Sequence, residues 1–187
     1  MKFLTDLKYI EKLITDSLSY IEEKNNDATL LGGFSGSVIE LLGRFMRVHK
    51  ITDSPNCFGD FLEKYLPKYA PHKNILYRIL RCEGAHSVIP QTGVMLTCAE
   101  ETKIHYLKGY QDVETGLKGL VIYCPVFVKD LQGAVKQFFS DVEKNSVFKN
   151  NCLETFNETI IKNQEIINGE ITKGRLKINF KTRWIKG

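Results

Sequence analysis

The chain has 187 residues, of which 43% are hydrophobic and 26% charged, with five prolines and a formal net charge of +4. This composition excludes disordered and collagen-like chains, and the length suffices for one compact domain with its own core. We therefore expect a single domain over residues 1–187, with a helical part at 1–90 and a part containing strands and helices at 91–187.

The sequence also argues against membrane, disulfide-rich and metal-binding proteins. No apolar run reaches the roughly 18 residues that a membrane helix requires. The N-terminal segment contains an acid, Asp6, before an apolar run long enough for a signal peptide could occur. The cysteines are odd in number, widely spaced and free of any Cys-x-x-Cys pair: Cys57, Cys82, Cys98, Cys124 and Cys152. We expect reduced thiols in a cytoplasmic protein with no membrane partner, no metal and no cofactor.

Four helices are predicted in the first half, and the first two have clear apolar stripes. Apolar residues recur at three-, four- and seven-residue spacing over 3–21, which is typical of an amphipathic helix. The glycine-rich segment 32–36 predicts an interhelical turn. A second helix is expected from about Ser35 or Ser37 to His49.

Helix-start and helix-stop residues define the next two elements. Ser54 followed by Pro55 has the residue types of an N-cap and a first helical position, which predicts a third helix ending at Leu66. A fourth helix is expected to begin near Pro71 and to end near Gly84. The residues that it is expected to carry toward the core are Ile75, Leu76, Ile79 and Leu80.

The second half changes to shorter apolar runs. A hairpin is predicted from two apolar or alternating segments, 93–98 and 103–107, which flank the polar pair Glu100 and Glu101. A further strand is predicted at 119–124. A helix opening at Pro125 and a second helix at about 146–167 follow. The predicted fold class is α+β, in which a mainly helical N-terminal bundle is followed by a small antiparallel or mixed sheet with covering helices.

One segment, 76–86 (LYRILRCEGAH), has a plausible catalytic interpretation. It contains Arg81 and, five positions later, His86. Both lie at the end of the predicted fourth helix. Histidine moves protons near neutral pH, and arginine holds phosphate oxygens with a planar, permanently charged fork. The segment resembles the Arg-x(4–6)-His signature of HEPN domains, which are helical bundles. The resemblance covers the helical N-terminal half at most.

This resemblance implies a metal-independent endoribonuclease of a defence or toxin type. Two protomers of a homodimer would bring their Arg/His motifs to one cleft for single-stranded RNA, whose own 2′-hydroxyl would attack the adjacent phosphate. Arg81 would bind the phosphate and His86 would act as general acid and base. Arg78, on the same segment, is a further candidate for contact with the substrate.

The spacing within the motif constrains this interpretation. Five residues at about 100° each would place Arg81 and His86 about 140° apart on an ideal α-helix. Convergence therefore requires the helix to end or distort near Gly84, or a second chain to supply one of the two residues. Arg44 and His49 form a second match to the same spacing, but Arg44 lies in a helix with bulky apolar neighbours, so we prefer Arg81.

The C-terminal segment alternates between apolar and basic residues, which predicts a half-buried strand. Its basic positions Lys177, Lys181 and Arg183 are candidates for contact with RNA phosphates, and Trp184 is a candidate for stacking on a base. An edge strand protected from aggregation by lysines explains the same pattern.

Two alternatives to catalysis remain open at this point. Arg81 is equally explained as an ion-paired residue, bound to Glu83 or Glu63. The whole chain is alternatively a non-catalytic helical module for binding or dimerisation, with a nucleotide, RNA or protein as its partner.

Overall fold

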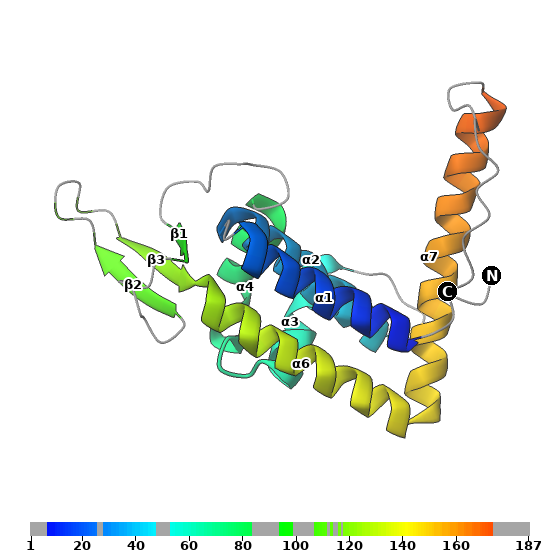
Figure 1. The fold of residues 1–187 in the computed structure, drawn as a ribbon, viewed down its shortest axis with the longest axis horizontal. Coiled ribbons are helices and arrows are strands. Elements are labelled where there is room, and N and C mark those ends of the chain that lie inside the picture. Colours follow the sequence, from blue (N-terminus) through cyan, green and yellow to red (C-terminus); the bar gives the residue numbers. More distant parts are fainter. Residues whose placement is uncertain are drawn as a thin grey trace.

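The computed structural model describes residues 7–25, 28–47, 53–83, 94–98, 107–111, 113, 116 and 118–173. Its elements in chain order are α1 (Leu7–Asn25), α2 (Ala28–Met46), α3 (Ser54–Tyr65), the 3₁₀ turn η2 (Ala70–His72), α4 (Lys73–Leu76), the π-helix η3 (Tyr77–Glu83), β1 (Val94–Thr97), β2 (Leu107–Gln111), β3 (Lys118–Tyr123), α6 (Cys124–Lys144) and α7 (Ser146–Thr172). Helices therefore dominate, and the small sheet lies at one end of the bundle (Figure 1).

Helix α1 forms where its amphipathic pattern predicts a helix. Its buried residues are Leu7, Ile10, Ile14 and Leu18. They face α2 and α6, and α1 lies alongside α6 in the opposite direction (Figure 1). The periodic apolar stripe therefore predicted this element correctly.

Helix α2 is the central element, and it begins at Ala28, earlier than the sequence predicted. The prediction of an interhelical turn at 32–36 is wrong, because these residues are helical. The glycines allow close packing instead: a Cβ added at Gly36 would lie 2.4 Å from the carbonyl oxygen of Leu80, and one at Gly43 would lie 1.9 Å from that of Cys57. The glycines therefore let η3 and α3 approach the α2 backbone.

Helix α3 matches its predicted range to within one residue. Its N-cap is Asp53, which makes no side-chain capping hydrogen bond, so the assignment of Ser54 as the N-cap is wrong by one position. The chain then turns through Pro67 and continues through η2 and α4 into η3. Among the four residues expected in the core here, Ile75 is exposed, and the others are buried: Leu76, Ile79 and Leu80.

The sheet is mixed, with β3 at its centre. Strand β1 pairs with β3 in parallel and β2 pairs with β3 antiparallel. In the described sheet β3 separates β1 from β2. The second segment of the predicted hairpin, 103–107, lies outside the described residues except for Leu107, so the hairpin stays a prediction. Of the two sheet types expected, the purely antiparallel one is excluded and the mixed one is confirmed. The buried residues at the end of β3, Val121 to Tyr123, explain why this strand pairs on both sides.

Helices α6 and α7 confirm the predictions for this part of the chain. Strand β3 leads directly into α6, which has Pro125 in its first turn and buries an apolar face from Cys124 to Val142. The inner part of α7 packs on the core, with Cys152 fully buried and Phe156 edge-on to Phe45. Its outer part projects beyond the bundle (Figure 1). The predicted C-terminal strand lies outside the described residues. No helix within them has the length and apolar character to span a membrane.

Candidate functional site

Glu40 is a charged residue in the interior of the bundle. Only 4% of it is exposed, and it lies on α2 between Gly36 and Gly43, four residues after one and three before the other. Residues three and four apart share a helix face. Because both glycines bring neighbouring backbone close, Glu40 faces the junction of α2 with α3 and η3.

Three side chains donate hydrogen bonds to the Glu40 carboxylate. The Ser54 hydroxyl, at the start of α3, donates to Oε1 over 2.9 Å. Arg44 Nη2, one turn further along α2, donates to the same oxygen and also to Ser54 Oγ over 3.1 Å. Arg81 Nε, from η3, donates to Oε2. Both carboxylate oxygens therefore bind a guanidinium, and one carboxylate connects three elements.

The surroundings of Glu40 keep it ionised. Burial alone would raise its pKa, but the hydrogen bonds from Ser54 and Arg81 and the positive charges of Arg44 and Arg81 outweigh burial and lower the pKa below 4.5. One negative charge thus lies between two positive charges. We call Glu40, Arg44, Ser54 and Arg81 the Glu40 cluster, and its formal net charge is +1.

The two arginines of the Glu40 cluster reach solvent. The side chain of Arg81 is 32% exposed and that of Arg44 is 39% exposed, whereas that of Glu40 is 5% exposed. A guanidinium has five N–H donors in a planar fork. The Glu40 carboxylate therefore orients both guanidinium groups, while part of each arginine side chain stays exposed to solvent.

A second ion pair nearby allows a matched comparison. Arg47 Nε, also on α2, donates to Asp60 Oδ2 on α3 over 2.6 Å, and its side chain is 32% exposed, as is that of Arg81. Asp60 is 38% exposed, so this carboxylate stays near solvent. The Arg47–Asp60 pair has the same chemistry as the Arg81–Glu40 pair, but its carboxylate is far less buried.

The structure locates only part of the site expected from the sequence. Arg81 lies in the Glu40 cluster, and Arg78 is exposed one turn earlier on η3. The remaining candidates lie outside the described residues: His86, Lys177, Lys181, Arg183 and Trp184. Whether these residues approach Arg81 therefore stays a prediction.

Arg81 is ion-paired, as the alternative interpretation expected, but its described partner is neither of the two suggested acids. Arg81 binds Glu40, while Glu63 binds Lys73 over 2.5 Å. The side chain of the other suggested partner, Glu83, is not among those described. Glu40 lies 41 positions before Arg81, so sequence proximity did not indicate the pair.

The arginines of the two Arg-x4-His matches in the sequence meet at this cluster. Arg44 and Arg81 bind opposite oxygens of Glu40. From the sequence the two motifs were competing candidates, and neither Glu40 nor Ser54 was a candidate for the site. One available signal was Glu40 itself, a single acid within the apolar sequence of α2 (VIELLGRF, 38–45).

The chemistry of the Glu40 cluster is that of an anion site. Arginine forks bind phosphate and carboxylate groups in a bidentate manner, and a fixed fork loses less entropy on binding. Within the described part of the chain, no group of three or more His, Cys, Asp or Glu residues is arranged to hold a metal ion. The π-helical turn that carries Arg81 is a rare geometry that often occurs at functional sites.

A scan of protein-family models, a search of curated proteins and a search of solved structures each found no match to this chain.

Proposed function

We propose that the protein is a HEPN-like, metal-independent endoribonuclease of a defence or toxin type, in which two chains form a composite Arg/His site. Arg81 holds the scissile phosphate of single-stranded RNA, and His86 transfers protons as the RNA 2′-hydroxyl attacks it. Arg78 and the basic positions Lys177, Lys181 and Arg183 contact neighbouring phosphates. Trp184 stacks on a base.

The observation that carries this proposal is the fixed position of Arg81. Its guanidinium binds a buried, ionised carboxylate through Nε, and its side chain as a whole is still 32% exposed. An arginine in this arrangement is oriented before substrate binds, and preorganised donors stabilise the charge that develops on a phosphate. Arg44 places a second cation beside it.

The π-helix gives further support to the Arg81–His86 pairing. Its backbone hydrogen bonds join residues five positions apart, compared with four in an α-helix. Five positions also separate Arg81 from His86. The objection that this spacing splits two residues across an α-helix is therefore weaker for a segment that begins as a π-helix.

An RNA-cleavage assay in EDTA tests the proposal directly. Wild-type protein, Arg81→Ala and His86→Ala are incubated with end-labelled single-stranded RNA. We expect cleavage by the wild type, with 2′,3′-cyclic phosphate or 2′-phosphate ends, and a decrease of about 100-fold or more in each variant. Cleavage that persists in both variants would contradict the assignment.

Arg47→Ala is the matched control for Arg81→Ala. It removes an arginine of equal side-chain exposure that is also bound to a carboxylate, so the change in net charge is the same, although the carboxylate that it leaves behind, Asp60, is closer to solvent than Glu40. We expect it to keep more than half of the wild-type rate. An equal loss in Arg47→Ala and Arg81→Ala would mean that net charge, and not the position of Arg81, decides activity.

A non-catalytic binding or dimerisation module is the second candidate function. It is favoured by apolar residues that α1 leaves exposed, among them Leu13 and Tyr20. Binding of RNA or of a protein partner without cleavage of any RNA tested, in wild type as in the variants, would favour this module over the ribonuclease.

A further inference from the structure

Helix α1 has a second apolar face in addition to the one that it buries. Tyr9, Leu13 and Tyr20 follow one another at helical spacing and are 48%, 54% and 61% exposed. Two of the three are tyrosines, and exposed aromatic residues are enriched at protein interfaces. We call these three residues the α1 stripe.

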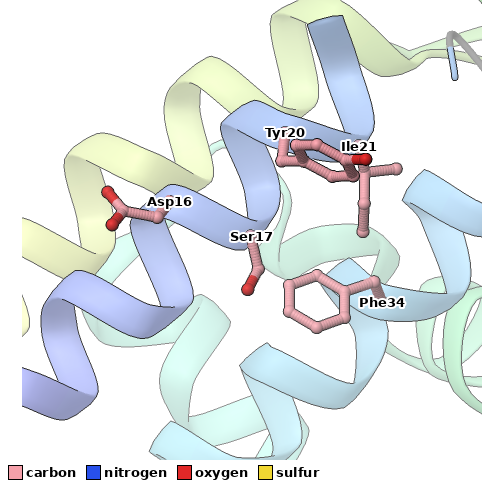
Figure 2. Close-up of a pocket in the computed structure, with 5 residues that line it drawn as sticks. All are labelled: Asp16, Ser17, Tyr20, Ile21 and Phe34. Carbon is pink, nitrogen blue, oxygen red and sulfur yellow. The ribbon is translucent and has the colours of Figure 1, made fainter. Parts of the chain in front are cut away.

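A shallow pocket lies beside the α1 stripe, between α1 and α2. Its volume is about 420 Å³, and its lining is Asp16, Ser17, Tyr20, Ile21 and Phe34. Figure 2 shows Ser17, Tyr20 and Ile21 of α1 lying over the ring of Phe34, while the Asp16 carboxylate points away from that ring. The α1 stripe therefore adjoins a hollow with aromatic walls.

The charges beside the α1 stripe are self-complementary. Lys12 and Asp16 form an ion pair on one edge of it, 2.6 Å apart, with side chains 74% and 61% exposed. A pair this exposed contributes little to stability, so exchanging partners costs little. If two α1 helices pack antiparallel about a two-fold axis between Ile14 and Thr15, Lys12 of each chain lies next to Asp16 of the other.

The apolar residues obey the same symmetry. Tyr9 and Tyr20 are equally far from the point between Ile14 and Thr15, so in this arrangement Tyr9 of one copy would face Tyr20 of the other. Leu13 lies close to the axis, and Tyr9 of the second copy lies beside the pocket at Tyr20. An isologous interface requires this kind of pattern, in which one surface complements itself.

We propose that the α1 stripe and its pocket form the interface of a homodimer in which two α1 helices pack antiparallel. The occupant of this face is thus a second copy of the chain. The interface excludes the α1 stripe from water and exchanges the Lys12–Asp16 pairs between chains. This proposal holds whether or not the protein cleaves RNA, because it depends on α1 and Phe34 and not on the Glu40 cluster.

Charge-exchanged chains test the proposal by analytical ultracentrifugation. One full-length chain carries Lys12→Asp and the other carries Asp16→Lys. Each alone places like charges across the proposed axis, so we expect its homodimer Kd to rise at least about tenfold. Mixing the two chains restores opposite charges, and we expect a heterodimer with nearly the wild-type Kd.

Mixing distinguishes a pair between chains from a pair within one chain. Neither chain of the mixture has an opposite-charge pair of its own at positions 12 and 16, so a restored dimer requires contacts between chains. Both residues are exposed, so we expect neither variant to lose its fold. Homodimers unchanged in both chains, or mixing that restores nothing, would overturn the proposal.

Substitutions in the apolar faces provide an independent control. Leu13→Glu is expected to raise the dimer Kd at least about tenfold, whereas Ile166→Glu on the outer part of α7, at a site of similar exposure, is expected to leave it unchanged. A dimer that dissociates only in Ile166→Glu would place the interface on α7. A wild-type chain that stays monomeric at hundreds of micromolar would reject the α1 interface altogether.

Discussion

Helix α2 and the outer part of α7 are both regular helices, but their sequences are constrained differently. On α2, Gly36 and Gly43 lie against the backbone of neighbouring elements, and Glu40 is buried between them. On outer α7, a Cβ added at Gly169 would meet no atom of another described element within 4 Å, and Ile166 is exposed. The difference teaches that glycine is constrained where elements converge and replaceable where a helix projects.

Gly43→Ala should have the largest effect on stability. Its Cβ would lie 1.9 Å from the Cys57 carbonyl oxygen, so α3 must move away from α2. We expect a loss of about 3 kcal/mol or more in the free energy of unfolding, measured by urea denaturation. A loss below 1 kcal/mol would show that the α2–α3 contact is looser than described.

Glu40→Gln should have the next largest effect. It leaves two arginines facing a neutral amide, and we expect a loss of about 2 kcal/mol, less than for a fully buried pair because both arginines reach solvent. Asp60→Asn, which alters the more exposed pair with Arg47, is the matched control, with an expected loss of about 0.5 kcal/mol. Equal losses of unfolding free energy in Glu40→Gln and Asp60→Asn would mean that burial of the carboxylate does not make the Glu40 pair more important for stability.

The pH dependence of stability should reveal the ionisation of Glu40. The folded-state pKa of Glu40 lies below its usual value of 4.5, so the charged cluster stabilises the fold above that pH and loses this contribution as pH falls through the folded-state pKa. The advantage of wild type over Glu40→Gln should therefore stay constant from pH 7 to about pH 5 and decrease below pH 4.5. Denaturation midpoints across this range measure it, and a constant advantage down to pH 3 would contradict it.

Gly169→Ala and Ile166→Glu should have the smallest effects. The added methyl of Gly169→Ala meets no atom of another element in the described part of the chain, and alanine favours helix, so we expect a gain of up to about 0.5 kcal/mol. Ile166→Glu alters an exposed site, where changes typically stay within about 0.5 kcal/mol. Thermal unfolding by circular dichroism measures both. A large loss in either variant would mean that outer α7 is packed against another surface.

Local patterns in the sequence predicted α1, α3 and α6, because each has an apolar stripe or a proline near its start that requires no knowledge of the rest of the fold. Helix α7 was predicted as a polar-rich helix. The start of α2 was mispredicted because glycine is as typical of a turn as of a close helix contact, and only the position of Leu80 and Cys57 distinguishes them. The place of β3 between β1 and β2 was not predicted, because strand order depends on contacts that form only when the chain folds.

In the candidate site, too, the residues that were not predicted are those whose contacts depend on distant parts of the chain. Its arginine was identifiable from the spacing of Arg81 and His86, whereas Glu40 and Ser54 are joined to Arg81 only by folding, across 41 and 27 positions. A buried acid is conspicuous only once its burial is known. The cluster therefore depended on three-dimensional information that the apolar pattern does not contain.

The π-helical turn makes this site depend on the helical register as well as on side-chain identity. Seven residues, Tyr77–Glu83, follow a register in which each turn holds more residues than an α-helical turn. Seven residues in this register turn the chain about as far as six residues of an α-helix, so deleting one residue there would restore an ordinary α-helix and leave everything after it facing nearly the same way. An α-helix that kept all seven residues would instead turn Arg81 by roughly 90° relative to Leu76, so burying Leu76 and keeping Arg81 on Glu40 would become mutually exclusive.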